Sequence, residues 1–168
     1  MTRFLVIVVS ALVLAACGTT RPSAPHVTAQ DWSGNYRFQW MPNTPAATRG
    51  LPVPQQVQIR PITSVKDVPG AQSAHNGPQW AISFVGQAGK PLPLTRFTAR
   101  DYEGLNLVQA RAAGQIACME SGAFLFLCRT PPGATVRFGR DTEDQLTSKT
   151  GLFGVVMHQG AFELTPLD

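Results

Sequence analysis

The chain has 168 residues, of which 43% are hydrophobic and only 14% are charged. This balance argues against a disordered chain and against a tail that coats nucleic acid. The 15 glycines and 14 prolines are more than long helices tolerate. If the first 16 residues are removed, as argued next, about 150 remain, which suits one domain with one hydrophobic core.

The amino terminus has the pattern of an export signal. A short basic start, Met1–Arg3, precedes an apolar run from Phe4 to Leu14. A helix needs about 20 apolar residues to cross a bilayer, so this run is too short to be a membrane span. The pattern therefore predicts a removable signal peptide over residues 1–16.

The end of this segment, Leu14-Ala15-Ala16-Cys17, resembles the lipobox of bacterial lipoproteins. The resemblance implies that the Cys17 thiol accepts a diacylglycerol, that signal peptidase II cuts before Cys17, and that the freed amine is acylated. Two or three acyl chains make a durable membrane anchor. In Gram-negative lipoproteins an Asp at the next position tends to retain the protein at the inner membrane. Gly18 stands there instead, so the resemblance implies the outer membrane, with the face left open.

The segment after Cys17 contains almost nothing to bury, because residues 18–29 read GTTRPSAPHVTA. Such a composition predicts a flexible tether. The expected organisation is a signal peptide over 1–16, a lipidated cysteine and tether over 17–29, and a β-rich globular domain over 30–168.

Positive charge is concentrated in the first half of the mature chain. Residues 17–100 contain eight basic side chains against Asp31 and Asp67. A surplus of this kind can favour anionic lipid headgroups. We expect instead that both halves interleave in one fold, so that the asymmetry disappears in space. Nucleic acid is not an expected partner, because the sequence has no basic cluster.

With Cys17 assigned to lipid, Cys118 and Cys128 remain as a pair in an oxidising compartment, which predicts a disulfide. The histidines lack the spacing of a zinc-ligand set, so neither a metal nor another cofactor is expected. Two registers stay open around this pair. A two-residue turn at Ser121-Gly122 would place Cys118 opposite Leu125, whereas a turn centred on Ala123 would place the two cysteines opposite each other.

Alternating apolar residues predict most of the domain to be β-strand. Tyr36, Phe38 and Trp40 form one such series, and Trp80, Ile82 and Phe84 form another. Further strands are expected over 57–59, 94–100, 105–111, 115–120, 123–129, 134–138, 152–158 and 161–165. A helix is expected only over 141–151, where Thr142 and Gln145 have capping-box spacing. The prediction is an all-β fold: a single small antiparallel barrel or sandwich of about nine strands with at most one short helix.

Two strand predictions are more specific. Residues 124–127 (FLFL) are apolar on both faces, so this strand should be covered on both sides. A two-residue turn at Gln159-Gly160 would place Met157 opposite Phe162, in agreement with the hydrophobic pattern.

The segment Trp32–Tyr36 (WSGNY) loosely resembles the opening strand of lipocalin-like barrels, in which G-x-W or G-x-Y recurs. The resemblance implies a barrel that encloses an apolar ligand. The candidate lining residues are Tyr36, Phe38, Trp40, Trp80 and Phe84. The alternative is that these side chains simply fill the core.

The sequence contains no nucleophile elbow, phosphate-binding loop or zinc-protease motif. Ser121 is interpreted as a turn residue, and an enzyme is not expected. The expected role is a non-catalytic accessory or docking module for another envelope protein. The alternatives are a carrier of a small apolar molecule and an inhibitor of a hydrolase such as lysozyme.

The lysozyme-inhibitor lipoproteins resemble this chain in size, anchor and β content, although their S-G-x-x-Y loop has no match at Ser121-Gly122-Ala123. A cavity of roughly 300 Å³ or more inside the barrel would favour the carrier. An exposed apolar patch or a bare sheet edge would favour docking.

Overall fold

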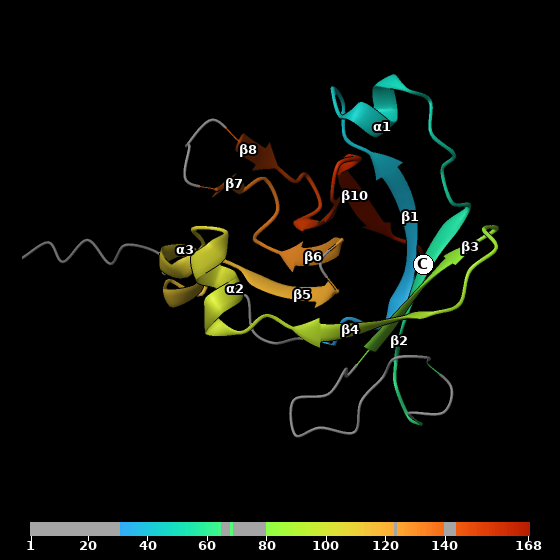
Figure 1. The fold of residues 1–168 in the computed structure, drawn as a ribbon, viewed down its shortest axis with the longest axis horizontal. Coiled ribbons are helices and arrows are strands. Elements are labelled where there is room, and N and C mark those ends of the chain that lie inside the picture. Colours follow the sequence, from blue (N-terminus) through green and yellow to red (C-terminus); the bar gives the residue numbers. More distant parts are fainter. Residues whose placement is uncertain (1–30, 65–67, 69–79, 123, 140–143) are drawn as a thin grey trace, which may run out of the picture.

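A computed structural model of the chain describes residues 31–64, 68, 80–122, 124–139 and 144–168. The regular secondary structure in this part of the chain is mainly β-strand (Figure 1). The main strands are β1 (Gly34–Trp40), β2 (Gln56–Pro61), β3 (Trp80–Val85), β4 (Leu92–Arg96), β5 (Ala117–Ser121), β6 (Leu125–Arg129), β9 (Leu152–Val156) and β10 (Gly160–Pro166). A smaller hairpin and three short helices complete it: β7 (Thr135–Phe138), β8 (Asp144–Thr147), α1 (Pro45–Thr48), α2 (Ala99–Gly104) and α3 (Val108–Ala112).

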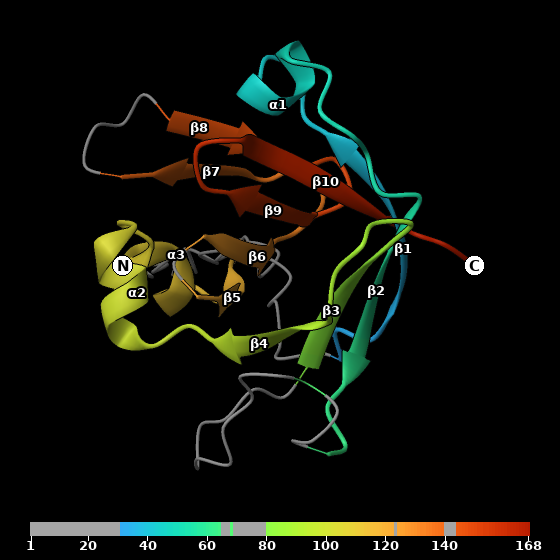
Figure 2. The ribbon, with the colours of Figure 1, turned by 45° about the vertical axis from the view of Figure 1, so that its right-hand side comes forward.

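The eight main strands close an antiparallel barrel in the order β1-β10-β9-β6-β5-β4-β3-β2. Strands that follow one another in the chain are neighbours, except that the β7–β8 hairpin is inserted between β6 and β9 (Figure 2). The predicted all-β class is confirmed, and of the two architectures considered the barrel is the correct one. Closure leaves no unpaired edge among these eight strands.

Because the strands alternate in direction, the barrel has two distinct ends. The tether end is the one at which β1 begins, at Gly34, and it carries the long connections between β4 and β5 and between β6 and β9. The opposite end is formed by the connections β1–β2, β3–β4, β5–β6 and β9–β10. We call this opposite end the mouth.

Aromatic residues seal the tether end. Trp32 is 3% exposed, and its backbone carbonyl accepts a hydrogen bond of 2.8 Å from the Tyr36 hydroxyl. The Arg129 guanidinium lies over the Trp32 ring, 5.0 Å from its centre. The Trp80 indole N–H donates to the Asp31 carboxylate at 3.4 Å. The barrel interior next to these residues is packed with aliphatic and aromatic side chains: Val57, Ile59, Ile82, Leu94, Met119, Leu127, Leu152, Phe162 and Leu164.

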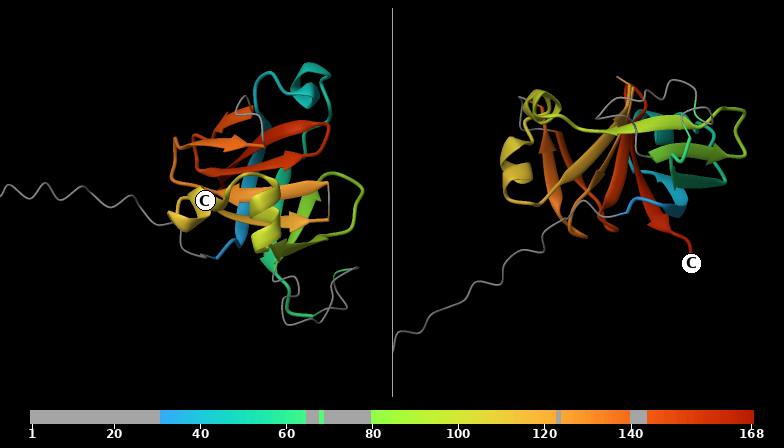
Figure 3. Two further views of the ribbon diagram at one scale, coloured as in Figure 1. Left: turned by 60° about the vertical axis from the view of Figure 1, so that its left-hand side comes forward. Right: turned by 90° about the horizontal axis from the view of Figure 1, so that it is seen from below.

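A second core lies outside the barrel wall. The outward faces of β5, β6 and β9 are covered by α2, α3 and the β7–β8 hairpin (Figure 3). Its buried members are Phe97, Tyr102, Leu107, Ile116, Cys118, Cys128, Val136 and Phe153. The strand predicted to be covered on both sides is therefore confirmed, since Leu125 and Leu127 of β6 face the barrel interior while Cys128 faces this second core.

Cys118 and Cys128 lie directly opposite each other on β5 and β6, with their sulfur atoms 2.00 Å apart, at disulfide-bonding distance. Ser121 pairs with Leu125, so the turn centred on position 123 is the correct register of the two considered. The pair sits in the second core, where Cys128 is fully buried and Cys118 is 4% exposed.

Three sequence predictions about secondary structure are wrong. The strand expected over 105–111 is replaced by the end of the α2 turn and by α3, so the fold has three short helices in place of the single one allowed. The helix expected over 141–151 is also wrong, since residues 144–147 form β8, paired with β7. Residues 141–143, which include Thr142 of the expected capping box, lie outside the described residues. Packing of Leu146 against the second core outweighed the local helix signal.

The register predicted for the last hairpin is wrong as well. Phe162 pairs with Gly154 and not with Met157, so that residues 157–159 form the turn. A Cβ atom at Gly154 would collide with the Phe162 ring, which means that the ring occupies the space left by the missing side chain. His158 adopts a φ of 63° in this turn, as expected where a three-residue loop includes a left-handed position.

Candidate functional site

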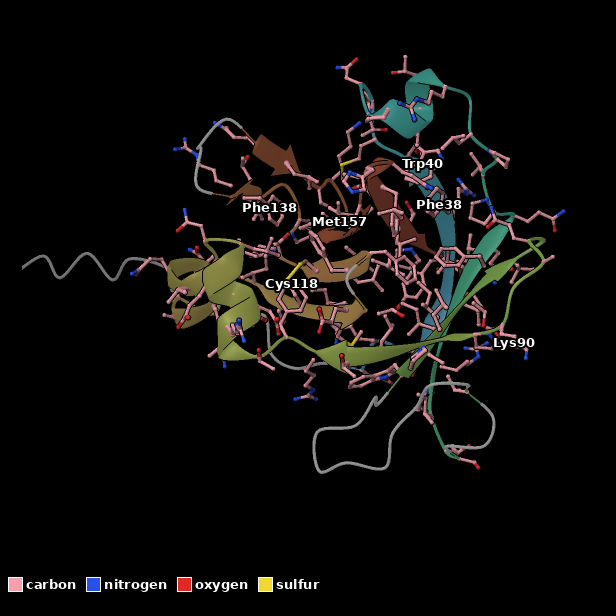
Figure 4. All side chains as sticks on the ribbon, in the orientation of Figure 1. Phe38, Trp40, Lys90, Cys118, Phe138 and Met157 are labelled. Atoms are coloured by element: carbon pink, nitrogen blue, oxygen red, sulfur yellow. A yellow bond between two sulfur atoms is a disulfide. The ribbon has the colours of Figure 1, made fainter. Side chains whose placement is uncertain are left out.

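The mouth of the barrel contains a pocket of about 530 Å³. Its walls come from inward-facing strand residues and from all four of the connections at this end. The strand residues are Phe38, Trp40, Phe84, Leu125 and Val156; the loop residues are Leu51, Pro52, Pro54, Gln87, Ala88, Phe124 and Gln159. Figure 4 shows Phe38 and Trp40 side by side at the mouth end of β1. The lining is mostly apolar, as is usual for sites that bind small apolar molecules.

The floor of this pocket is a group of packed aromatic rings. The rings of Phe38 and Phe162 are stacked with their centres 4.6 Å apart. The Trp40 ring meets Phe38 edge-on at 4.9 Å, and Phe84 lies 6.5 Å from Phe38. Offset stacking and edge-on contacts are the favoured arrangements of such rings. Phe38, Trp40 and Phe84 line the pocket, and Phe162 supports the floor by packing against Phe38 and Trp40.

The proline-rich connection between β1 and β2 forms one side of the pocket and is held in place by backbone hydrogen bonds. The Met41 N–H donates to the carbonyl of Ala161 at 2.9 Å, and the Ala46 N–H donates to that of Gln159 at 2.7 Å. At the other end of this connection, the Gln55 N–H donates to the carbonyl of Val85 at 3.0 Å. These bonds join the connection to strands on both sides of the mouth.

One polar atom of a residue that lines this pocket lacks a partner. The indole Nε1 of Trp40 is buried and has no acceptor among the described residues. A buried N–H without an acceptor costs roughly 1–3 kcal/mol. An oxygen atom on a bound molecule would remove that cost if it reached the indole.

The structure divides the five predicted lining residues into two groups. Phe38, Trp40 and Phe84 line the pocket at the mouth. Tyr36 and Trp80 lie in the sealed tether end, where they are 3% and 9% exposed. Burial raises the pKa of the Tyr36 phenol above its ordinary value, with the nearby Arg129 acting in the opposite direction. Both residues belong to the core. The interpretation as pocket lining therefore applies to Phe38, Trp40 and Phe84, and the interpretation as core filling applies to Tyr36 and Trp80.

Sequence reasoning missed the loop residues of the pocket. No motif or periodicity in the sequence identifies Leu51, Pro52, Pro54 or Ala88 as lining residues. The density of prolines between Met41 and Pro54 was the one available hint, because a stiff, apolar loop is suited to forming a wall.

A second hollow, of about 610 Å³, lies on the outer wall of the barrel between α2 and the tip of the β5–β6 hairpin. Glu120 lines it, and burial together with the nearby Asp101 raises the pKa of the Glu120 carboxyl. Asp101 itself is engaged, since its carboxylate accepts hydrogen bonds of 2.6 Å from the Thr98 N–H and hydroxyl in a capping box. This hollow is a weaker candidate than the mouth because its acidic groups serve the helix or face solvent.

Within the described residues, no three His, Cys, Asp or Glu side chains gather as a metal site. No helix in this part of the chain is long and apolar enough to span a membrane. Comparison with known proteins gives no match: no protein family, no curated protein and no solved structure matches this chain.

Proposed function

We propose that this protein is a non-catalytic lipoprotein of the bacterial outer membrane that binds a small apolar molecule in the mouth of its barrel. The observation that carries the proposal is the pocket of about 530 Å³ over the ring floor of Phe38, Trp40 and Phe84. Its volume lies within the range of roughly 300–1,000 Å³ typical of small-molecule sites. The carrier, one of three roles derived from the sequence, is thus the one that the geometry supports best.

The ligand that suits this pocket has an apolar body and one oxygen acceptor. The apolar walls favour the body through the removal of apolar surface from water. The unpartnered indole N–H of Trp40 favours a carboxylate or carbonyl at one end. A fatty acid combines both features, and dodecanoic acid is a suitable probe.

The test uses displacement of a fluorescent apolar dye, anilinonaphthalene sulfonate, by dodecanoic acid. Ala88→Trp adds a large ring to an exposed loop position at the pocket wall, and we expect it to weaken dodecanoic acid binding at least tenfold. Ala112→Trp makes the same change at an exposed position of α3 and should leave binding unchanged. Equal affinity in both variants, or no displacement in the unaltered protein, would contradict the proposed site.

The membrane anchor is tested separately. Its support is the lipobox at Leu14–Cys17 and the tether-like composition that follows. Metabolic labelling with a radioactive fatty acid should mark the unaltered protein and not the Cys17→Ser variant. Equal labelling of the two proteins would refute the anchor while leaving the pocket untouched.

A further inference from the structure

The exposed apolar side chains of this protein are not spread evenly. Five large hydrophobic side chains are exposed in the described residues: Val53, Val85, Val108, Phe124 and Met157. All except Val108, which lies on α3, belong to the connections or strand ends of the mouth. Scattered exposed apolar residues need no explanation, whereas a group at one end of a molecule indicates a contact surface.

These side chains form two pairs beside the pocket. Phe124 lines the pocket itself, whereas Met157 lines the neighbouring hollow on the outer wall. In one pair, Phe124 and Met157 are held together because the Met157 N–H donates to the Phe124 carbonyl at 2.8 Å. In the other, Val53 belongs to the connection that bonds to Val85 through Gln55. We call these four residues, Val53, Val85, Phe124 and Met157, the apolar rim. Figure 4 labels Met157 near the centre of the view.

The charges of the mouth have a single sign. Its described connections carry Arg49 and Lys90, both exposed, and contain no carboxylate. Lys90 follows Gln87 and Ala88 of the pocket wall, and Figure 4 places it in the connection between β3 and β4. Glu120 faces the hollow on the outer wall, which Met157 also lines.

An apolar rim with cations beside it matches the surface of a bilayer that contains anionic lipid. Apolar side chains enter the boundary between headgroups and acyl chains, while each nearby Lys or Arg contributes about 1 kcal/mol of attraction to anionic headgroups. We propose that the mouth docks on an anionic lipid surface through the apolar rim, Arg49 and Lys90. The docked mouth opens its pocket toward the acyl chains, so an apolar ligand can enter without crossing water.

The proposed anchor permits this orientation although it joins the other end of the barrel. The chain between Cys17 and Asp31 can span at most about 46–50 Å, at 3.3–3.6 Å per residue. The seven residues of β1 rise by about 23 Å. A tether of this length can therefore run back along the barrel wall and allow the mouth to face the membrane that holds the lipid.

The test measures binding of the mature chain from residue 17 onward, with Cys17→Ser to exclude lipid attachment, to vesicles by flotation. All eight strands of the closed barrel lie between Gly34 and Pro166, so this protein contains the whole barrel. Vesicles of phosphatidylcholine mixed with phosphatidylglycerol should bind it, and vesicles of phosphatidylcholine alone should bind it much more weakly. If the protein floats with neither type of vesicle, the proposal is overturned and the apolar rim is assigned to a protein partner.

Matched variants locate the contact. Arg49→Gln with Lys90→Gln should weaken vesicle binding about thirtyfold, equivalent to about 2 kcal/mol. The same change at Arg137 and Lys149, which are exposed on β7 and near the tether end, should have no effect. Met157→Ser should weaken binding, while Val108→Ser, at a position of nearly equal exposure (44% against 45%), should not. Equal losses in the mouth variants and their controls would refute the assignment.

These measurements test ligand binding and membrane docking separately, so that either proposal can fail without the other. The Arg49 and Lys90 variant should retain its affinity for dodecanoic acid in the absence of vesicles. Ala88→Trp should lose that affinity and retain vesicle binding. If the unaltered protein binds vesicles and not dodecanoic acid, the docking surface stands and the proposed carrier role falls.

Discussion

Gly154 and Phe162 provide the sharpest test of the barrel interior. They face each other across β9 and β10, and a Cβ at position 154 would collide with the Phe162 ring and lie 2.7 Å from a methyl carbon of Leu127. Phe162 is fully buried and stacked on Phe38, so its ring has little room to move. Gly154→Ala therefore overpacks the core, at a cost of about 1–3 kcal/mol.

The corresponding fall in melting temperature follows from the size of the domain. The entropy of unfolding is about 2.1 cal/mol/K per residue, or about 0.3 kcal/mol/K for roughly 140 folded residues. A loss of about 1–3 kcal/mol then lowers Tm by about 3–10 °C. Thermal unfolding followed by circular dichroism measures this shift, and urea unfolding gives the free energy directly.

A double-mutant cycle separates the collision from other effects of the new methyl group. Phe162→Leu removes the outer part of the ring, so Gly154→Ala should cost at least about 0.5 kcal/mol less in that background. Gly89→Ala is the matched control, since a Cβ there meets nothing within 4 Å. It should leave the free energy of unfolding unchanged or slightly raised, because alanine reduces the entropy of the unfolded chain. An identical cost of Gly154→Ala in both backgrounds would refute the contact.

Two further predictions concern the outer wall of the barrel. Reduction of the Cys118–Cys128 pair, which are 10 residues apart, should lower the free energy of unfolding by about 2–3 kcal/mol through the freed loop entropy. Comparison of Tm with and without reductant measures this, and an unchanged Tm would contradict it. Burial raises the pKa of Glu120, which means that the folded state disfavours the ionised carboxylate. This destabilises the fold at pH 7, where Glu120 is ionised, but not at pH 3, where it is neutral. Glu120→Gln should therefore raise Tm at pH 7 more than at pH 3, and the reverse order would show that Glu120 is stabilised in its charged form.

Much of the barrel could be predicted from local patterns. The alternation through Tyr36, Phe38 and Trp40 correctly identified β1, because a strand that faces a core on one side must alternate. The apolar run at 124–127 correctly indicated a strand covered on both faces, since Leu125 is buried in the barrel interior and Phe126 packs against the second core. Both predictions depend only on neighbouring residues in the chain.

Predictions failed where distant residues decided the outcome. The capping-box spacing near residue 142 was a local helix signal, but residues 144–147 pair with β7 and place Leu146 against the second core. The register of the last hairpin differs from the predicted one because Gly154 accommodates the ring of Phe162. A hydrophobic pattern cannot reveal this fit. Burial against another element contributes more free energy than a cap, so tertiary packing prevailed.

The lipobox at Cys17 and the strand periodicity are properties of the sequence by itself, and they predict a lipid-anchored β-domain. The tertiary structure alone decided which aromatic residues form a pocket. Period-two alternation determines the face of a strand on which a side chain lies, but not its height along the barrel axis. That height places Tyr36 in the sealed tether end and Trp40, four residues later, in the mouth. Closure of the barrel also gathered Val53, Phe124 and Met157 at one end, since only the alternating strand directions bring those connections together.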